Sequence, residues 1–596
     1  MITPTFSDLP DLLTKLAEKQ RAIFTHTFGT PAQSDMTAEQ TFMGDAREVC
    51  HALVNHPEAG TNAWIHAMEK TAAHAFSFMN LFDTSATPGK GWDATRAIQE
   101  YASGFHTISK EALTEMVAGL DGIEEKKRQR FLFYMLQWME ALSPSNSLLT
   151  NPELMAHTVK EGGGNLFKGF DNLLNDIRCD SGELSISMTD THAFEVGKNL
   201  ATTPGQVVLK NEVMELIQYA PSSEAVFKRP LLMVPPWINK YYILDLNQKN
   251  SMAKWLVEQG FTLFLISWAS PDGPMENGTF EGYMKEGILA ALDAITEITG
   301  EKRPHVAGYC TGGTLLATTL AWLAAKKEDR VASATFMATP IDFSKPGDLG
   351  VFIDEAQVNA LISETSETGF LDGRKLAKTF NMLRPNDLIW SYVVKNYLKG
   401  EAPIPFDILY WNSDAANIPA EMYAWHLKNT YLENNLAKPQ GVRLAGRALS
   451  MKDIKIPTYF LATVEDHIVL WEGVYKGARL MGGPTRFVLA ESGHVAGVVN
   501  PPAKEKYGYH TNRTLPESTE SWQENAIHQK GSWWLDWMKW LKPRSGKKVE
   551  PREPQEKGLG AAPGSFVKRS LAPKKRCRQS CSCQKPVDEN AFPMAH

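Results

Sequence analysis

Residues 303–317 read Arg303-Pro-His-Val-Ala-Gly-Tyr-Cys-Thr-Gly-Gly-Thr-Leu-Leu-Ala317, which predicts a short apolar strand, a sharp turn at Cys310 and then a helix. This is the outline of a nucleophile elbow, in which a reactive side chain sits on a strained strand-to-helix turn. The residues two before and two after the nucleophile must be small, and here they are Gly308 and Gly312. Ser is the usual nucleophile at such a turn, whereas this chain has Cys. A buried, unreactive cysteine in an ordinary strand-to-helix turn would show a similar sequence. Whether Cys310 is a nucleophile therefore depends on the residues elsewhere in the chain.

Short runs of β-branched and aromatic residues alternate with helical stretches from about residue 200 onward. The runs cover 230–234, 261–268, 305–308, 332–338, 457–462 and 486–490. Each has the length of a strand and is bounded by polar or turn residues. This alternation is typical of βα units and predicts an α/β fold with a largely parallel sheet. The helix expected at 313–325 is apolar nearly all round, as a helix packed on a central sheet should be.

A cysteine nucleophile needs a base, and the base needs an orienting carboxylate, because a free thiol is only slightly ionised at neutral pH. Asp466 follows the run at 457–462, and His494 follows the run at 486–490. The order Cys310, Asp466, His494 along the chain is that of α/β-hydrolases, and each residue lies beyond an expected strand. His467 is a rival base and Glu465 a rival carboxylate, but both lie too close to Asp466 in sequence to complete a triad with it.

Acyl transfer at such an elbow also needs an oxyanion hole. The backbone N–H of Thr311, directly after the nucleophile, is one expected donor. The second should come from the loop 235–239, which follows an earlier strand. Since the two prolines at its start have no N–H, Trp237 or Ile238 is the expected donor.

More than a hundred residues separate the runs at 332–338 and 457–462, too many for a simple crossover. We expect residues of about 341–450 to form a cap, or lid, over the carboxyl ends of the strands, where it controls entry and excludes water. A second packing domain without a gating role is the alternative. Near the C-terminal end of the catalytic part, Trp533, Trp537 and Trp540 share one helical face, which favours packing on the sheet over contact with a polymer.

The domain organisation expected from these patterns has three parts. Residues 1–195 show helical periodicity and predict a mainly helical N-terminal domain. Residues 196–545 form the catalytic domain, including the cap. Residues 546–596 are polar, basic and poor in core residues, so a disordered tail is expected. Its three closely spaced cysteines could bind metal, but no fourth ligand is evident, so we expect neither a metal nor a cofactor.

Composition excludes several classes of function. The 62 Lys and Arg residues are interspersed with 68 Asp and Glu residues, so no basic field for nucleic acid is present. No uncharged stretch is long enough to span a membrane, and the first residues do not resemble a signal peptide. Cysteines are too sparse in the body of the chain for a disulfide framework, which favours a reducing compartment and predicts a cytoplasmic protein.

Several longer stretches give the chain a resemblance to class I polyhydroxyalkanoate synthases, which are α/β-hydrolase-type enzymes. The stretches are 234–246, 267–272, 308–313, 465–469 and 492–502. The resemblance implies catalysis by Cys310, Asp466 and His494, with (R)-3-hydroxyacyl-CoA as substrate and a growing polyester chain as product. It also implies a homodimer working at the granule surface among granule-associated proteins. This chain departs from the family in having Ala269 and Ser270 where Arg-Asn is more common, and in continuing to His596.

A physical argument for cysteine stands beside the resemblance. Transfer from a CoA thioester to a cysteine conserves the thioester, so the acyl group stays activated for attack by the next hydroxyl, whereas a serine ester would lose that activation. A cysteine-dependent α/β-hydrolase, such as a dienelactone-hydrolase-like enzyme or a thioesterase, is the first alternative, although those enzymes are much shorter. A non-catalytic granule-binding protein is the second, and an intact triad argues against it.

Overall fold

Ten strands form one mixed sheet at the centre of the catalytic part of the chain. The computed structural model describes residues 33–80, 94–177 and 184–571. The strands in spatial order are β1 (Gly205–Lys210), β2 (Met214–Tyr219), β7 (Leu263–Trp268), β4 (Leu231–Val234), β8 (His305–Tyr309), β9 (Ser333–Met337), β14 (Thr458–Thr463), β15 (Thr485–Ala490), β16 (Gly508–Thr511) and β17 (Ile527–Lys530). The six in the middle, from β7 to β15, are parallel to one another and match the six expected runs. The antiparallel strands β1, β2, β16 and β17 at the edges were not expected.

Helices cover the sheet, and their composition explains why. Helix α11 (Thr311–Lys326) is buried continuously from Thr311 to Leu323, as its lack of a polar face predicts. Helix α18 (Trp534–Leu541) and the preceding Trp533 bury their indoles in the same core. The indole N–H of Trp537 donates to Thr335 Oγ1 of β9 at 2.9 Å. The prediction that these tryptophans pack on the sheet is therefore confirmed. The fold is that of an α/β-hydrolase.

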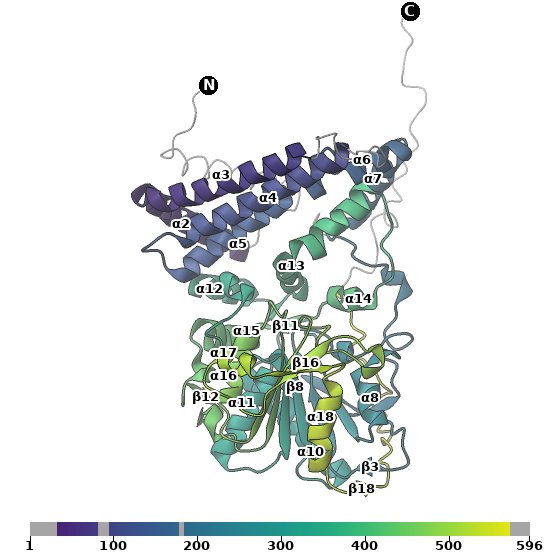
Figure 1. The fold of residues 1–596 in the computed structure, drawn as a ribbon. Helices are drawn as coiled ribbons and strands as arrows, with labels where there is room; N and C mark the ends of the chain where they lie inside the picture. The colour runs from purple at the N-terminus through teal and green to yellow at the C-terminus, as the bar shows by residue number, and fades with distance from the viewer. Residues whose placement is uncertain (1–32, 81–93, 178–183, 572–596) are drawn as a thin grey trace, which may run out of the picture.

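The residues between β9 and β14 contain several short helices above the sheet. They are α12 (Glu355–Thr365), α13 (Gly373–Leu383), η7 (Asn386–Trp390), η8 (Val393–Leu398), α14 (Asp407–Ser413), α15 (Ala420–Leu427) and η9 (Lys428–Leu432). The ring of Trp237, in the loop after β4, packs edge-on against Tyr423 and His426 of α15. The insertion therefore lies over the carboxyl ends of the parallel strands, and Figure 1 shows it between the sheet and the N-terminal helices.

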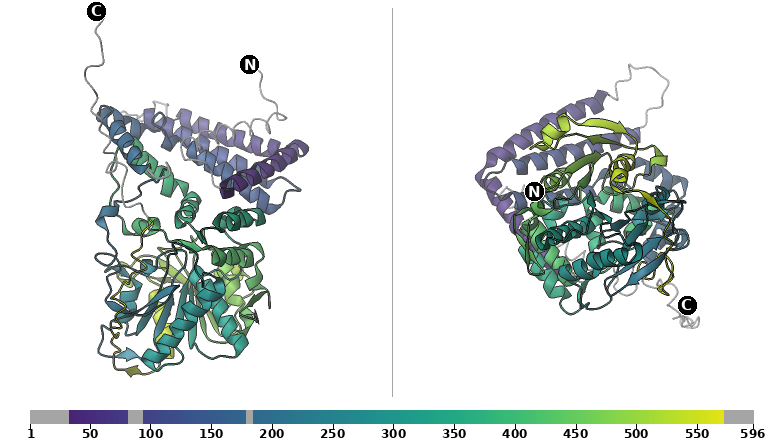
Figure 2. Two further views of the ribbon diagram at one scale, coloured as in Figure 1. Left: turned by 180° about the vertical axis from the view of Figure 1, so that it is seen from behind. Right: turned by 90° about the horizontal axis from the view of Figure 1, so that it is seen from below.

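The N-terminal helices form a separate layer that rests on this insertion. They are α2 (Gln33–Asn55), α3 (Pro57–Asn80), α4 (Ala94–Ala118), α5 (Glu125–Ala141), α6 (Pro152–Lys160) and α7 (Gly164–Asp176). The buried guanidinium of Arg130 in α5 pairs with Asp45 of α2 and with Asp354 before α12. In α7, Asp176 accepts a hydrogen bond from the hydroxyl of Tyr397 at 2.6 Å. Figures 1 and 2 show this layer on the side of the insertion that faces away from the sheet.

The chain remains ordered beyond residue 545, so the expected disorder from residue 546 does not hold for residues 546–571. We call these residues the C-terminal segment. Its strand β18 (Lys548–Val549) pairs with β3 (Val226–Phe227), and further along Phe566 and Val567 are buried. The buried carboxylate of Glu215 in β2 accepts hydrogen bonds from the N–H groups of Ser565 and Phe566. Composition missed this because the anchoring uses backbone groups. Residues 572–596, with the three tail cysteines, lie outside the described residues.

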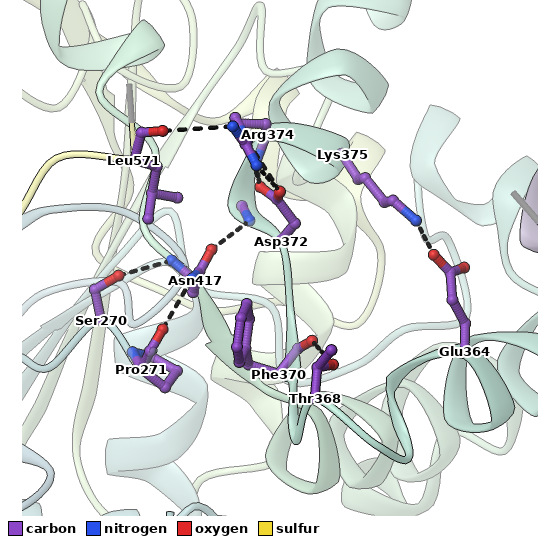
Figure 3. Close-up of polar contacts among 11 residues, drawn as sticks. Ser270, Pro271, Glu364, Thr368, Phe370, Asp372, Arg374, Lys375, Asn417 and Leu571 are labelled. Carbon is purple, nitrogen blue, oxygen red and sulfur yellow. Dashed lines mark hydrogen bonds and ion pairs between the residues drawn. The ribbon is translucent and has the colours of Figure 1, made fainter. Parts of the chain in front are cut away.

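A second set of contacts joins the insertion to the core, as Figure 3 shows. Asn417, next to the short strand β11 (Ile418–Pro419), donates from its backbone N–H to Ser270 Oγ at 2.9 Å and from its side chain to the carbonyl oxygen of Pro271 at 2.8 Å. Arg374 of α13 donates to the carbonyl oxygen of Leu571. Ser270, a departure from the family pattern, thus has a structural partner in the insertion.

Candidate active site

Cys310 occupies a strained turn between β8 and α11, with φ 51° and ψ −126°. Its N–H donates to the carbonyl oxygen of Met337 on the neighbouring strand β9 at 2.9 Å, which holds the turn in place. A Cβ added at Gly312 would overlap the carbonyl oxygen of Pro235, and one at Gly308 would overlap the backbone of Gly313. The close backbone approach thus explains why both positions are glycine, and strain of this kind is common at functional turns.

His494 lies between Cys310 and Asp466. Its Nδ1–H donates to Asp466 Oδ2 at 2.6 Å, and Cys310 lies close enough to the ring to raise its pKa. The ring of Tyr309, the residue before Cys310, stacks on the imidazole with centroids 5.4 Å apart. The hydroxyl of Tyr309 donates to the carbonyl oxygen of His494 at 2.9 Å. The three residues expected from the sequence are therefore brought together, and Tyr309 is a fourth that no sequence pattern singled out.

Asp466 is fixed by more than its contact with His494. Its side chain is fully buried, and Oδ1 accepts the backbone N–H groups of Ile468 and Val469 at 3.0 and 2.8 Å. The hydroxyl of Thr463 donates to Oδ2 at 3.2 Å. Backbone N–H groups directed at a carboxylate stabilise its charged form and fix its orientation. Asp466 is therefore built to face one ring nitrogen of His494.

The electrostatics of the site favour a charged histidine. Burial by itself lowers the pKa of His494, but the negative charges of Asp466 and Cys310, with the hydrogen bond to Asp466, outweigh burial and raise the pKa well above its ordinary value. At neutral pH the ring therefore holds a proton on each nitrogen, one directed at the carboxylate and the other available toward sulfur. Such a ring stabilises a thiolate and can later return a proton to a leaving group.

The rival residues take no part in this arrangement. Burial, and then the positive charge of Arg384, lower the pKa of His467 to about 4, so its ring is neutral at physiological pH. Its Nδ1 has no hydrogen-bond partner among the residues that the structure describes. Glu465 is exposed. The histidine and the carboxylate that face each other are His494 and Asp466.

The loop with the second expected oxyanion donor is bonded to Thr311, the first expected donor. Thr311 is the first residue of α11, so its N–H has no acceptor within the helix. Trp237 is nearly buried, and its indole N–H donates to the carbonyl oxygen of Thr311 at 3.2 Å. This bond fixes the loop that contains Trp237 and Ile238 beside the turn of the nucleophile. The hydroxyl of Thr311 is buried without a partner in the described chain.

Aromatic side chains of the insertion close over the site, and Cys310 is only 5% exposed. Burial and the nearby Cys310 both raise the pKa of Tyr431 above its ordinary value. His426 packs edge-on against Trp237, Phe343 and Tyr431, and burial lowers its pKa to about 3. The sequence indicated an aromatic-rich insertion but not which of its residues reach the nucleophile, since that depends on how the insertion folds back.

Neither a metal-binding cluster nor a membrane-spanning helix is found among the described residues. Among residues 33–80, 94–177 and 184–571, no cluster of three or more His, Cys, Asp or Glu side chains is arranged to hold a metal ion. A search of the same ranges finds no helix with the length and apolar character needed to cross a bilayer. A cysteine with a histidine, a carboxylate and backbone donors can form and break a thioester.

Comparison with known proteins gives consistent results. Residues 89–256 match the family described as "Poly-beta-hydroxybutyrate polymerase (PhaC) N-terminus", and residues 230–501 match the α/β hydrolase fold. The chain is 49% identical over 484 residues to a poly(3-hydroxyalkanoate) polymerase of Methylorubrum extorquens, covering 80% of this chain and 79% of that one. It is 43% identical over 491 residues to the PhaC subunit of the polymerase of Cupriavidus necator, covering 80% and 82%.

Proposed function

Because the chain belongs to the family of poly(3-hydroxyalkanoate) polymerases, an acyltransferase family that joins hydroxyalkanoate units into a polyester, we propose that it does so through a thioester on Cys310. The substrate is an (R)-3-hydroxyacyl-CoA, and CoA is released. The observation that supports this most directly is the position of His494, which is hydrogen-bonded to Asp466 at 2.6 Å and close enough to Cys310, at the strained turn, for that residue to raise the pKa of the ring.

In the loading step, the sulfur of Cys310 attacks the carbonyl carbon of the acyl-CoA. A new carbon–sulfur bond forms, and the carbonyl oxygen takes up negative charge opposite the N–H groups of Thr311 and of Ile238 or Trp237. The bond to the sulfur of CoA then breaks, and CoA leaves with a proton from His494. Because one thioester replaces another, the acyl group keeps its activation.

In the elongation step, the 3-hydroxyl of another unit attacks the carbonyl carbon of the chain on Cys310. An ester bond forms, the bond to Cys310 breaks, and the hydroxyl proton passes to His494, which restores the charged ring beside the freed thiolate. Asp466 stabilises the imidazolium while the ring holds that proton. A hydroxyl is a much weaker acid than a thiol, so this step depends more strongly on the charge of Asp466.

The insertion of about residues 341–450 acts as a cap in this scheme. A thioester on Cys310 would be lost to hydrolysis if water reached it freely, and the cover of Tyr431, His426 and Trp237 supports water exclusion. Because Cys310 is only 5% exposed, the cap must move to admit an acyl-CoA.

The proposal also covers where the enzyme works and how it assembles. The enzyme works in the cytoplasm as a homodimer at the granule surface, among granule-associated proteins. Residues 1–195 provide the contacts to partner and granule, a role supported by exposed apolar side chains on α7, where Phe167 and Phe170 are 81% and 60% exposed.

The test compares wild type with Cys310→Ala, using 3-hydroxybutyryl-CoA, a free-thiol reagent for released CoA and an assay for insoluble product. We expect Cys310→Ala to lose both activities, because without the sulfur there is no covalent intermediate. Wild-type turnover in Cys310→Ala would disprove the mechanism. CoA release by wild type without any insoluble product would instead favour a cysteine-dependent hydrolase, the alternative function.

A further inference from the structure

Lys240 lies at the meeting point of three parts of the molecule. Lys240 lies two residues after Ile238, one of the two proposed oxyanion donors of the loop, and its side chain is only 5% exposed. Its ammonium donates to Asp414 Oδ1 of the cap at 2.6 Å and to the carbonyl oxygen of Arg569 in the C-terminal segment at 2.6 Å. An ammonium so deeply buried is tolerated only with such partners, which makes the position of Lys240 strongly dependent on both.

The cap holds Lys240 and its neighbours through several bonds. The indole N–H of Trp411 in α14 donates to the carbonyl oxygen of Lys240 at 2.8 Å. Asp414, at the end of the same helix, accepts the hydroxyl of Tyr242 at 2.9 Å through its other oxygen. The carbonyl of Lys240 and the side chain of Tyr242 are therefore both fixed to the end of α14.

The C-terminal segment reaches Lys240 from a firm anchor. Glu215 holds Ser565 and Phe566, as described above, and Arg569 follows three residues later. The carbonyl oxygen of Leu571 accepts from Arg374 of the cap, a contact visible in Figure 3. The segment thus runs from the edge of the sheet to the cap and meets Lys240 on the way.

The two ends of the loop 235–240 are held differently. At its start, the carbonyl oxygen of Pro235 accepts the indole N–H of Trp268 at 2.9 Å, a bond within the core. At its end, the bonds of Lys240 go to the cap and to the C-terminal segment. Between the ends, the indole N–H of Trp237 donates to the carbonyl oxygen of Thr311 at 3.2 Å. The loop is therefore held by the core at its start and middle, and by contacts from outside the core at Lys240.

We propose that Lys240 is a positioning residue for acyl transfer: its bonds to Asp414 and to the Arg569 carbonyl hold the loop in the conformation that presents the oxyanion donors. This inference rests on the proposed function of that loop. When the cap moves to admit substrate, the bond from Lys240 to Asp414 breaks and the loop relaxes. Cap closure and assembly of the oxyanion hole are then one event.

The first experiment uses Lys240→Met, with Lys254→Met as the control. Lys254 is 40% exposed on α8 (Met252–Glu258), where its ammonium lies 3.9 Å from Glu258 and donates to the carbonyl oxygen of Gln248 at 3.5 Å. We expect kcat for CoA release to fall at least about tenfold in Lys240→Met with KM changed less than about threefold, because oxyanion donors act on the transition state. Alkylation of Cys310 by iodoacetamide should stay within about twofold of wild type, since it needs no oxyanion hole. A rise in KM alone would overturn the proposal.

A double variant separates positioning from stability. Lys240→Met leaves a buried carboxylate unpaired, which lowers stability. Lys240→Met/Asp414→Asn removes that charge too, so Tm should recover toward wild type while kcat stays low. If kcat recovers together with Tm, Lys240 is only structural and the proposal is wrong. Should Lys240→Met fail to fold, the double variant supplies the kinetic comparison.

A third comparison tests the contact with the C-terminal segment. A chain ending at Val567 loses the Arg569 carbonyl, whereas a chain ending at Leu571 keeps it. We expect the shorter chain to show the kcat loss of Lys240→Met and the longer one to match wild type. Wild-type kcat in the chain ending at Val567 would remove Arg569 from the proposal. None of these variants changes Cys310, so they test the positioning role alone. Failure of the proposed function would be seen separately, as turnover by Cys310→Ala.

Discussion

The Nδ1–H of His494 donates to Asp466 Oδ2 across 2.6 Å, and Cys310 lies close enough to the same ring to raise its pKa. Asp466→Asn should therefore separate the loading of Cys310 from the elongation of the chain. Loading starts from an ionised thiol and needs His494 only to protonate the leaving CoA, whereas elongation needs a proton taken from a hydroxyl, so we expect short acyl chains to accumulate on Cys310 while long polymer falls sharply. Intact mass and peptide mapping after mixing with 3-hydroxyacyl-CoA measure both. Equal loss of loading and elongation would reduce Asp466 to an orienting role.

The raised pKa of His494 gives a second prediction, on pH dependence. A group whose pKa lies well above its ordinary value keeps its proton throughout the neutral range, so the wild-type ring stays charged at both pH 6 and pH 8. Alkylation of Cys310 by iodoacetamide should therefore change little between these pH values. In His494→Gln the thiol must ionise unaided, so alkylation should be slow at pH 6 and rise toward pH 9. A flat profile in His494→Gln would argue against His494 as the proton acceptor.

The turn at Cys310 gives a third prediction. A Cβ at Gly312 would overlap the carbonyl oxygen of Pro235, which is backbone and cannot swing aside. We expect Gly312→Ala to lose about 1 to 3 kcal/mol of unfolding free energy and most of its activity, because either the turn or the loop 235–240 must shift. Gly44→Ala in α2 is the matched control: nothing lies within 4 Å of a Cβ there, so the change should stabilise by about 0.5 to 1 kcal/mol. Urea denaturation measures both. Unchanged stability in Gly312→Ala would show that the turn can adapt.

How much the sequence predicted depended on the kind of burial. Strands such as β7 are buried on both faces and read as apolar runs, so they were predictable. Strand β2 contains the buried Glu215, which pairs with Lys210 nearby but also with Ser565 and Phe566, 350 and 351 residues later, and no local pattern reveals this second pairing. Strand β17 is exposed along its whole length, so it lacks an apolar pattern altogether.

The site divides in the same way. Cys310, Asp466 and His494 each follow a strand, so the order of elements was enough to find them. Tyr431 reaches the site through the folding of the cap, and Arg569 reaches Lys240 through the C-terminal segment that was expected to be disordered. Contacts of this kind depend on packing between distant parts, which composition and periodicity do not report.

The last prediction concerns the attachment of the N-terminal layer to the cap. Arg130 is 5% exposed and bridges Asp45 of α2, at 2.5 and 3.1 Å, and Asp354 before α12, at 2.6 Å. Arg130→Met would leave two carboxylates without their cation, one of them buried. Removing one partner of a buried ion pair typically costs about 3 to 5 kcal/mol, so Arg130→Met should unfold at distinctly lower urea concentration than wild type.

Because Asp354 also caps α12 by accepting the N–H of Gln357, the loss should loosen the start of the cap as well as the helical layer. Limited proteolysis followed by mass spectrometry should then show new cleavage near residues 345–365. Arg47→Met, at an exposed position of α2, is the control and should match wild type in both measurements. If Arg130→Met is destabilised without new cleavage in that region, Arg130 stabilises the N-terminal helices alone and the cap is held by other contacts.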